Sequence, residues 1–221
     1  MNRLICALGI FAAALGSTPI PSRADEAQKP AETSSVAPEA IRDFAKQPEP
    51  VRRLLTEALA LTEKGLTYTY GSADPAQGGM DCSGAVYYLL GRAGVGKAPR
   101  SSAAQYRWAW EAGTLYPVIG SKADTFELSE LRPGDLLFWT GTYDIDRDPP
   151  ITHVMIYAGR LKKDGQHIMV GASDGRSFGG KARHGVGVFD FKFPHRGAKE
   201  DSKSRFVGYA RIPGLVPPPM P

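Results

Sequence analysis

The residue with the clearest chemical potential is Cys82, which stands in Asp81-Cys82-Ser83-Gly84 directly before an apolar helical pattern. A thiol at a helix N-terminus faces the positive end of the helix dipole, which favours the reactive thiolate. The unpaired N–H groups of the first turn are suited to hold an oxyanion while a carbonyl is attacked. We interpret Cys82 as a nucleophile. The alternative is that Asp81 caps the helix and Cys82 packs as a small apolar side chain.

A thiol nucleophile is best served by a histidine partner, and His153 is the candidate. It opens the apolar run 154–157 after the long polar loop 140–152, so a strand would hold it rigidly beside solvent. The alternative is a surface histidine at a strand start. Three further histidines have bland explanations in strands or loops: His167, His184 and His195. The histidine spacing is not that of metal ligands, so we expect neither a zinc site nor another cofactor.

The first 24 residues have the pattern of a secretory signal peptide. Asn2 and Arg3 precede an apolar run over residues 4–15, and small residues before Ala24 suit a signal peptidase. The run is short for a membrane span, and Cys6 lies inside it, so no membrane or lipid anchor is expected. We expect export to the periplasm or cell envelope after cleavage near Ala24. Cleavage removes Cys6 and leaves Cys82 alone in an oxidising compartment, where a lone thiol favours a functional explanation.

Composition indicates one ordinary domain with extensions. The 221 residues are 42% hydrophobic and 23% charged, with a net charge of +4. The basic residues are scattered rather than clustered, so nucleic-acid binding is not expected. Residues 25–48 lack an apolar period and predict a flexible tether, with a short helix over 41–46. Residues 49–221 should form the domain, which we expect to be monomeric.

Helices precede strands in this domain. An apolar face begins after Pro50 and stops at Gly65, a second helix follows Cys82, and Ser102 with Gln105 has the spacing of a capping box. Short apolar or alternating runs then predict strands over 136–139, 154–157, 167–172, 186–191 and 208–212. This order predicts an α+β domain.

Together these segments resemble the NlpC-type (NlpC/p-sixty) cell-wall peptidases, a branch of the papain-like cysteine peptidases. The resemblance runs from about residue 66 to residue 212. The matching motifs, in family order, are Tyr68-Thr69-Tyr70-Gly71, Asp81-Cys82-Ser83-Gly84, Pro99-Arg100-Ser101, Leu131-Arg132-Pro133-Gly134-Asp135-Leu136, His153-Val154-Met155-Ile156-Tyr157 and Gly208-Tyr209-Ala210-Arg211. The resemblance implies a papain-like core, with N-terminal helices packed on a central antiparallel β-sheet of about five to six strands.

The resemblance also implies an activity: hydrolysis of an amide in peptidoglycan stem peptides, commonly between γ-D-glutamyl and a diamino acid. Cys82 would attack the carbonyl, His153 would shuttle the proton, and Tyr68 would line the site. Asp81 and Ser83 would help hold the free amine of the substrate. Two alternatives stay open: an amidase or acyltransferase of the same fold, and an inactive wall-binding domain.

One position departs from the family pattern. Relatives carry a third polar residue on the strand after the base strand, and here that position is Gly171. His167 lies about 13 Å away along a strand that rises about 3.3 Å per residue, too far to replace it. Ser173 and Asp174 are the candidates for the third catalytic residue, with a water or a backbone carbonyl as alternatives.

Overall fold

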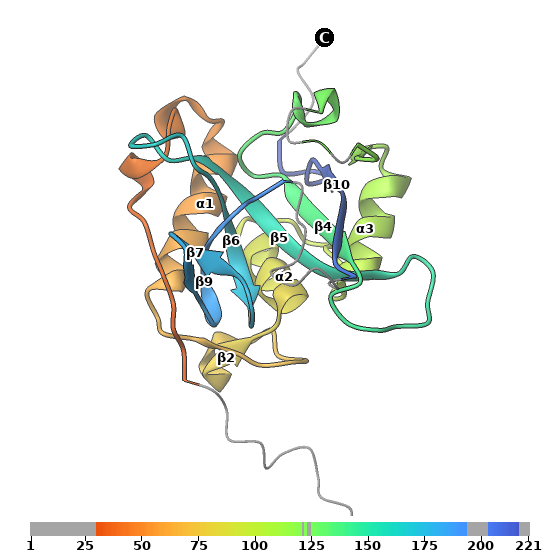
Figure 1. The fold of residues 1–221 in the computed structure, drawn as a ribbon, viewed down its shortest axis with the longest axis horizontal. Helices are drawn as coiled ribbons and strands as arrows, with labels where there is room; N and C mark the ends of the chain where they lie inside the picture. The colour runs from red at the N-terminus through yellow and green to blue at the C-terminus, as the bar shows by residue number, and fades with distance from the viewer. Residues whose placement is uncertain (1–29, 121, 123–124, 194–202, 217–221) are drawn as a thin grey trace, which may run out of the picture.

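The computed structural model describes residues 30–120, 122, 125–193 and 203–216 (Figure 1). The predicted signal peptide lies outside these residues. Within them, α-helices α1 (Glu49–Thr62), α2 (Cys82–Arg92) and α3 (Ser102–Glu111) pack on one face of a six-stranded antiparallel sheet. The fold is therefore α+β with helices on a central antiparallel sheet, as predicted.

The sheet has the strand order β3-β10-β4-β5-β6-β9. The bounds of its strands are Leu115–Pro117 (β3), Leu136–Thr140 (β4), Ile151–Arg160 (β5), His167–Ser173 (β6), Gly185–Asp190 (β9) and Arg205–Ala210 (β10). Two small pairs lie beside it: Thr67–Tyr68 (β1) with Gly79–Met80 (β2), and Ser177–Phe178 (β7) with Lys181–Ala182 (β8). The five longer strands overlap the predicted runs, but β5 extends past its run of 154–157 at both ends, and β10 begins three residues before its run of 208–212 and ends two residues earlier. Strand β3 and the short pairs carry no pattern long enough to predict.

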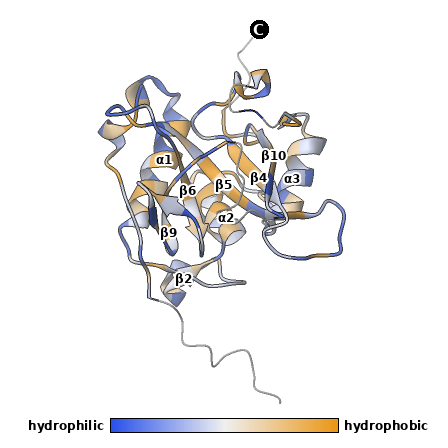
Figure 2. Ribbon diagram, viewed as in Figure 1, coloured by the Kyte–Doolittle hydropathy of each residue, from blue (hydrophilic) through white to orange (hydrophobic). Residues whose placement is uncertain are grey.

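Both faces of the central strands are buried. Side chains such as Val154 and Ile156 join the helices in the main core, while Met155 and Tyr157 point into a second core with Trp139. Figure 2 shows the resulting hydrophobic character of β4 and β5. A strand covered on both faces carries a continuous apolar run rather than an alternating one, and β5 has this pattern. His153, near the start of β5, is therefore held by tightly packed neighbours.

The helices begin where polar side chains cap them. Asp81 accepts a hydrogen bond from the Gly84 N–H at the start of α2. At α3 the cap is Ser101, which accepts from the Ala104 N–H, rather than the predicted Ser102. Ser102 is buried and its hydroxyl donates to the Ile151 carbonyl, which ties α3 to the start of β5.

The described part of the predicted tether, residues 30–48, packs on the domain instead of standing free. Glu32 forms a two-way backbone bridge with His184, and Ser34 bonds to Val188 on the outer edge of β9. Ile41 bridges to Leu161 and is fully buried in the main core. The predicted helix over 41–46 is a single 3-10 turn at Phe44–Lys46. The ordered domain therefore starts before the predicted boundary at residue 49.

Candidate active site

Cys82 is the first residue of α2, and two local features fix it there. Asp81 caps the helix, accepting from the Gly84 N–H at 2.6 Å. Gly84 lets the loop before α2 approach closely, because a Cβ at this position would lie 2.1 Å from the Ser72 carbonyl oxygen. Any larger residue would move that loop, so Gly84 of the nucleophile motif is what allows the loop to pack against the start of α2.

The Cys82 side chain is almost completely buried, with 6% exposed. Burial raises the pKa of the thiol to about 11, and the charge of Asp81 acts in the same direction. Hydrogen bonds from the Val154 and Ser83 backbone and from the Tyr68 hydroxyl lower the pKa but do not offset burial. Burial therefore opposes the thiolate that the helix terminus was expected to favour.

His153 lies at the start of β5, directly before Val154, whose backbone bonds to Cys82. The predicted nucleophile thus sits beside the residue that adjoins the predicted base. The imidazole is buried and packs against the Trp139 ring on β4, with ring centroids 5.6 Å apart. The fold brings the two catalytic candidates together from segments far apart in the chain.

Arg176 is a site residue that the sequence did not reveal. Its Nε–H donates to His153 Nε2 at 3.2 Å, and its guanidinium lies over the Trp139 ring, 4.1 Å from the centroid. Burial lowers the pKa of Arg176 to about 10, so it stays charged at neutral pH. It lies in the loop after β6, and the sequence of a loop does not indicate which side chain its arginine will contact.

The Arg176 contact fixes the protonation of the free site. Because the guanidinium only donates, Nε2 of His153 must accept, and the proton of the neutral ring is on Nδ1. A positively charged imidazolium, with protons on both nitrogens, would lose this hydrogen bond. A neutral imidazole and the neutral Cys82 thiol are therefore mutually consistent in the free protein.

The residues predicted for the third position are placed as follows. Gly171 has φ of +156°, and a Cβ there would lie 3.0 Å from the Met155 sulfur. Ser173 is buried, pairs with Gly185 on β9 and accepts from the Gly175 N–H. Asp174 is exposed. Ser173 and Asp174 stay predictions as orienting residues, while Arg176 makes the contact with Nε2.

His167 lies away from the site. It pairs with Arg160 at the far end of β5, and its Nδ1 lies 2.7 Å from the Tyr157 hydroxyl.

Asp81 and Ser83, predicted to hold the substrate amine, are both bound to Arg100 in the free protein. The Arg100 guanidinium donates to both Asp81 carboxylate oxygens, at 3.0 and 2.8 Å, and to the Ser83 hydroxyl at 3.0 Å. The same carboxylate also accepts from the Gly71 and Gly84 N–H groups. These contacts hold the helix start and Arg100 together in the free protein, and the contact of Asp81 and Ser83 with a substrate amine stays a prediction.

Tyr68 lies beside the candidate nucleophile. Its hydroxyl bonds to the Cys82 sulfur, and the side chain is half-buried. Burial, followed by the charge of Cys82, raises the pKa of Tyr68 well above its ordinary value. The hydroxyl therefore stays protonated and remains a hydrogen-bond donor beside the sulfur.

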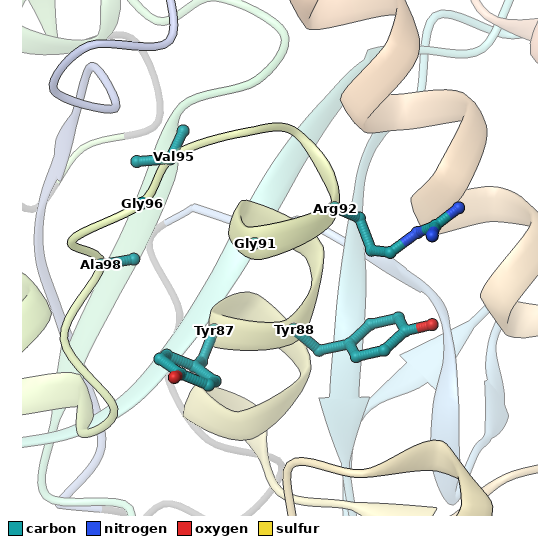
Figure 3. A pocket seen from close by; sticks show the side chains of 7 residues that line it. All are labelled: Tyr87, Tyr88, Gly91, Arg92, Val95, Gly96 and Ala98. Atoms are coloured by element: carbon teal, nitrogen blue, oxygen red, sulfur yellow. The ribbon is translucent and has the colours of Figure 1, made fainter.

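Two surface hollows lie apart from these residues. One, of about 340 Å³, is lined by the C-terminal half of α2 and the loop after it, including Tyr87, Tyr88 and Arg92 (Figure 3). The other, of about 310 Å³, lies between Arg42 and Tyr157. Neither includes Cys82 or His153, so we locate the site by its chemistry rather than by the depth of the surface.

Two classes of feature are missing from the described part of the chain. No three His, Cys, Asp or Glu side chains gather there closely enough to hold a metal ion. None of its helices combines the length and the apolar character that crossing a membrane requires.

The sequence model of the NlpC/P60 family matches residues 65–183, more than half of the chain. This stretch includes Tyr68, Cys82, Arg100, His153 and Arg176. The chain belongs to the NlpC/P60 family, which confirms the predicted resemblance.

Individual relatives are similar over parts of their length. Gamma-DL-glutamyl hydrolase of Bacillus subtilis (strain 168) is 33% identical over 95 residues, which are 43% of this chain and 18% of that protein. A solved structure described as similar to a lipoprotein of the NLP/P60 family, from Staphylococcus aureus subsp. aureus Mu50, gives a TM-score of 0.46 at 23% identity. That comparison covers 75% of this chain and 42% of the other. The chain thus spans less than half of each relative.

Proposed function

We propose that this protein is an exported cysteine peptidase that hydrolyses γ-D-glutamyl–diamino acid bonds in peptidoglycan stem peptides. The observation that carries the proposal is the meeting of Cys82, at the start of α2, with the beginning of β5 beside His153. Family membership supports hydrolysis of a wall-derived amide, and the similarity to the gamma-DL-glutamyl hydrolase of Bacillus subtilis supports a γ-glutamyl bond.

The reaction begins from neutral groups. His153 takes the thiol proton while Cys82 Sγ bonds to the scissile carbonyl carbon, and the carbonyl electrons move to the oxygen. Because Nε2 accepts from Arg176 in the free protein, Nε2 must release Arg176 and take the ring proton before Nδ1 can accept the thiol proton. The first N–H groups of α2 are suited to hold the oxyanion.

The tetrahedral intermediate then collapses. The C–N bond breaks, the leaving amine takes the proton from His153, and an acyl-enzyme remains on Cys82. A water molecule, deprotonated by His153, attacks the acyl carbon and releases the γ-carboxylate and the thiol. Tyr68 lines this site beside the sulfur, and Asp81 with Arg100 holds the loop and helix start in place.

Digestion of purified peptidoglycan tests the proposal. Wild-type protein should release fragments with a free glutamyl γ-carboxylate and a free diamino acid amine, as read by mass spectrometry. Cys82→Ala and His153→Ala should release none, whereas Arg205→Gln, an exposed site on β10, should match the wild type. Cleavage by Cys82→Ala would refute the nucleophile, fragments cut at the glycan–peptide amide would indicate an amidase, and binding without cleavage would indicate a wall-binding domain.

Export is tested separately. Mass spectrometry of the protein recovered from the cell envelope should find an N-terminus at Asp25. Recovery of the uncleaved chain from the cytoplasm would contradict export.

A further inference from the structure

The charge of Arg176 is only partly balanced by the protein. Within the part of the chain that the structure describes, Arg176 contacts the His153 nitrogen and the Trp139 ring, and no carboxylate there lies within ion-pair distance of it. Asp174 is near enough to raise the pKa of Arg176, but its exposed carboxylate makes no ion pair with it. A half-buried guanidinium without a paired anion is less stable than a paired one, so a ligand that supplies an anion would be favoured here.

The guanidinium also has unused donors. Only Nε has a hydrogen-bond partner in the described structure, and neither Nη atom is among the buried atoms that lack one. Arg176 is half-buried rather than fully enclosed, so its two Nη groups are within reach of a ligand. Arginine offers its N–H groups in a planar fork that matches the two oxygens of a carboxylate.

The second arginine near the nucleophile is already occupied. Arg100 binds both oxygens of Asp81, as described above, and its charge is balanced. Arg176, in contrast, lies 3.2 Å from the catalytic imidazole, and a charge on Cys82 raises its pKa, which places it close to both reacting groups. Of these two cations, Arg176 is the one with capacity for a substrate.

We propose that Arg176 recognises the free α-carboxylate of the γ-glutamyl unit whose side-chain carbonyl is attacked by Cys82. A γ-linked glutamyl residue keeps this carboxylate a few bonds from the scissile carbonyl, whereas an α-linked residue has none at that position. A carbonyl held at Cys82 would bring the carboxylate to the neighbouring guanidinium. This inference rests on the proposed function and adds the residue that selects a γ-glutamyl substrate by its charge.

A matched pair of stem-peptide substrates tests the assignment. One carries the γ-D-glutamyl α-carboxylate, and the other carries an α-carboxamide of the same size. The measured quantity is the ratio of kcat/KM for the two substrates. Wild-type protein should prefer the carboxylate by about ten- to a hundredfold, the range expected for a charge-assisted hydrogen bond. Arg176→Gln should bring the ratio close to one, mainly through KM for the carboxylate substrate, and Arg176→Lys should keep part of the preference.

The control is Arg205→Gln, which removes an exposed arginine and should keep the wild-type ratio. Because the ratio compares two substrates on one protein, a loss of activity that affects both substrates equally, through a disturbed His153, leaves the ratio unchanged. Wild-type preference that survives in Arg176→Gln, or wild-type protein that cleaves both substrates equally, would overturn the assignment. If wild-type protein cleaves neither substrate, the proposed function itself fails. Should Arg176→Gln not fold, the lysine variant carries the same comparison, and an unchanged ratio there refutes the fork geometry.

Discussion

Replacing Ile41 with alanine tests whether residues 30–48 belong to the folded domain. The Ile41 side chain is fully buried in the main core, and its backbone bridges to Leu161. Its Cγ2 also lies against Gly159 in β5, 3.2 Å from the place where a Cβ would be. A side chain held in this way should contribute to global stability even though it precedes α1.

The size of the effect follows from the carbons removed. Isoleucine to alanine deletes three carbon atoms, worth about 0.8 kcal/mol each by transfer, or roughly 2.4 kcal/mol together. The cavity left beside Gly159 and Leu161 adds to this, so we expect a loss of about 2.5–4 kcal/mol in the free energy of unfolding. In a domain of this size the melting temperature should fall by about 5–15 °C.

Urea unfolding followed by circular dichroism, with a thermal melt in parallel, measures this loss. Ile119→Ala is the matched control, because Ile119 is 90% exposed and its truncation should change stability by less than about 0.5 kcal/mol. If Ile41→Ala proved as stable as Ile119→Ala, residues 30–48 would not be part of the cooperative unit. The originally predicted free tether would then be correct.

Three further outcomes are expected. Alkylation of Cys82 by iodoacetamide in the free protein should be slow at neutral pH and rise towards about pH 11, because burial raises the pKa of the thiol; a plateau below pH 8.5, near the ordinary thiol pKa of about 8.5, would contradict this. Burial lowers the pKa of His167 to about 4 from its ordinary 6.5. The stability contributed by the neutral ring is therefore complete above pH 6.5 and is lost as the pH falls towards 4. His167→Gln should flatten that part of a plot of melting temperature against pH, and an unchanged slope would refute the assignment. Gly171→His should destabilise the protein rather than supply the missing third residue, because its Cβ meets the Met155 sulfur in a backbone conformation that favours glycine; a stable and faster enzyme would show the opposite.

Local patterns were enough to predict the framework of the fold. The helical period after Pro50, the continuous apolar run of β5 and the motif around Cys82 depend on neighbours in the sequence, and each appears in the structure where it was expected. The family resemblance supplied what periodicity cannot, namely that the start of β5 meets the start of α2.

Features that depend on tertiary closure could not be predicted in this way. Ile41 is a single apolar residue in a polar segment, and one residue has no period to detect. The reach of Arg176 to His153 depends on how the loop after β6 folds back, and the thiol pKa depends on burial from every side. The missing third residue was sought on the strand itself, at Gly171, Ser173 and Asp174, whereas the contact with Nε2 comes from the following loop.

The N-terminal segment also has a consequence for how copies of the chain behave towards one another. Strand β9 is the last strand of the sheet, and backbone bonds from Ser34 and Leu66 occupy its outer edge, with Glu32 bonded to His184 directly before it. At the opposite edge, β3 is only three residues long and ends in Pro117, which has no N–H to offer. Both edges are thus poor templates for another strand. Proteolytic loss of residues 30–48 would remove the Ser34 bonds and leave the β9 edge at Val188 open to a strand of a second molecule, so we expect this segment to limit aggregation.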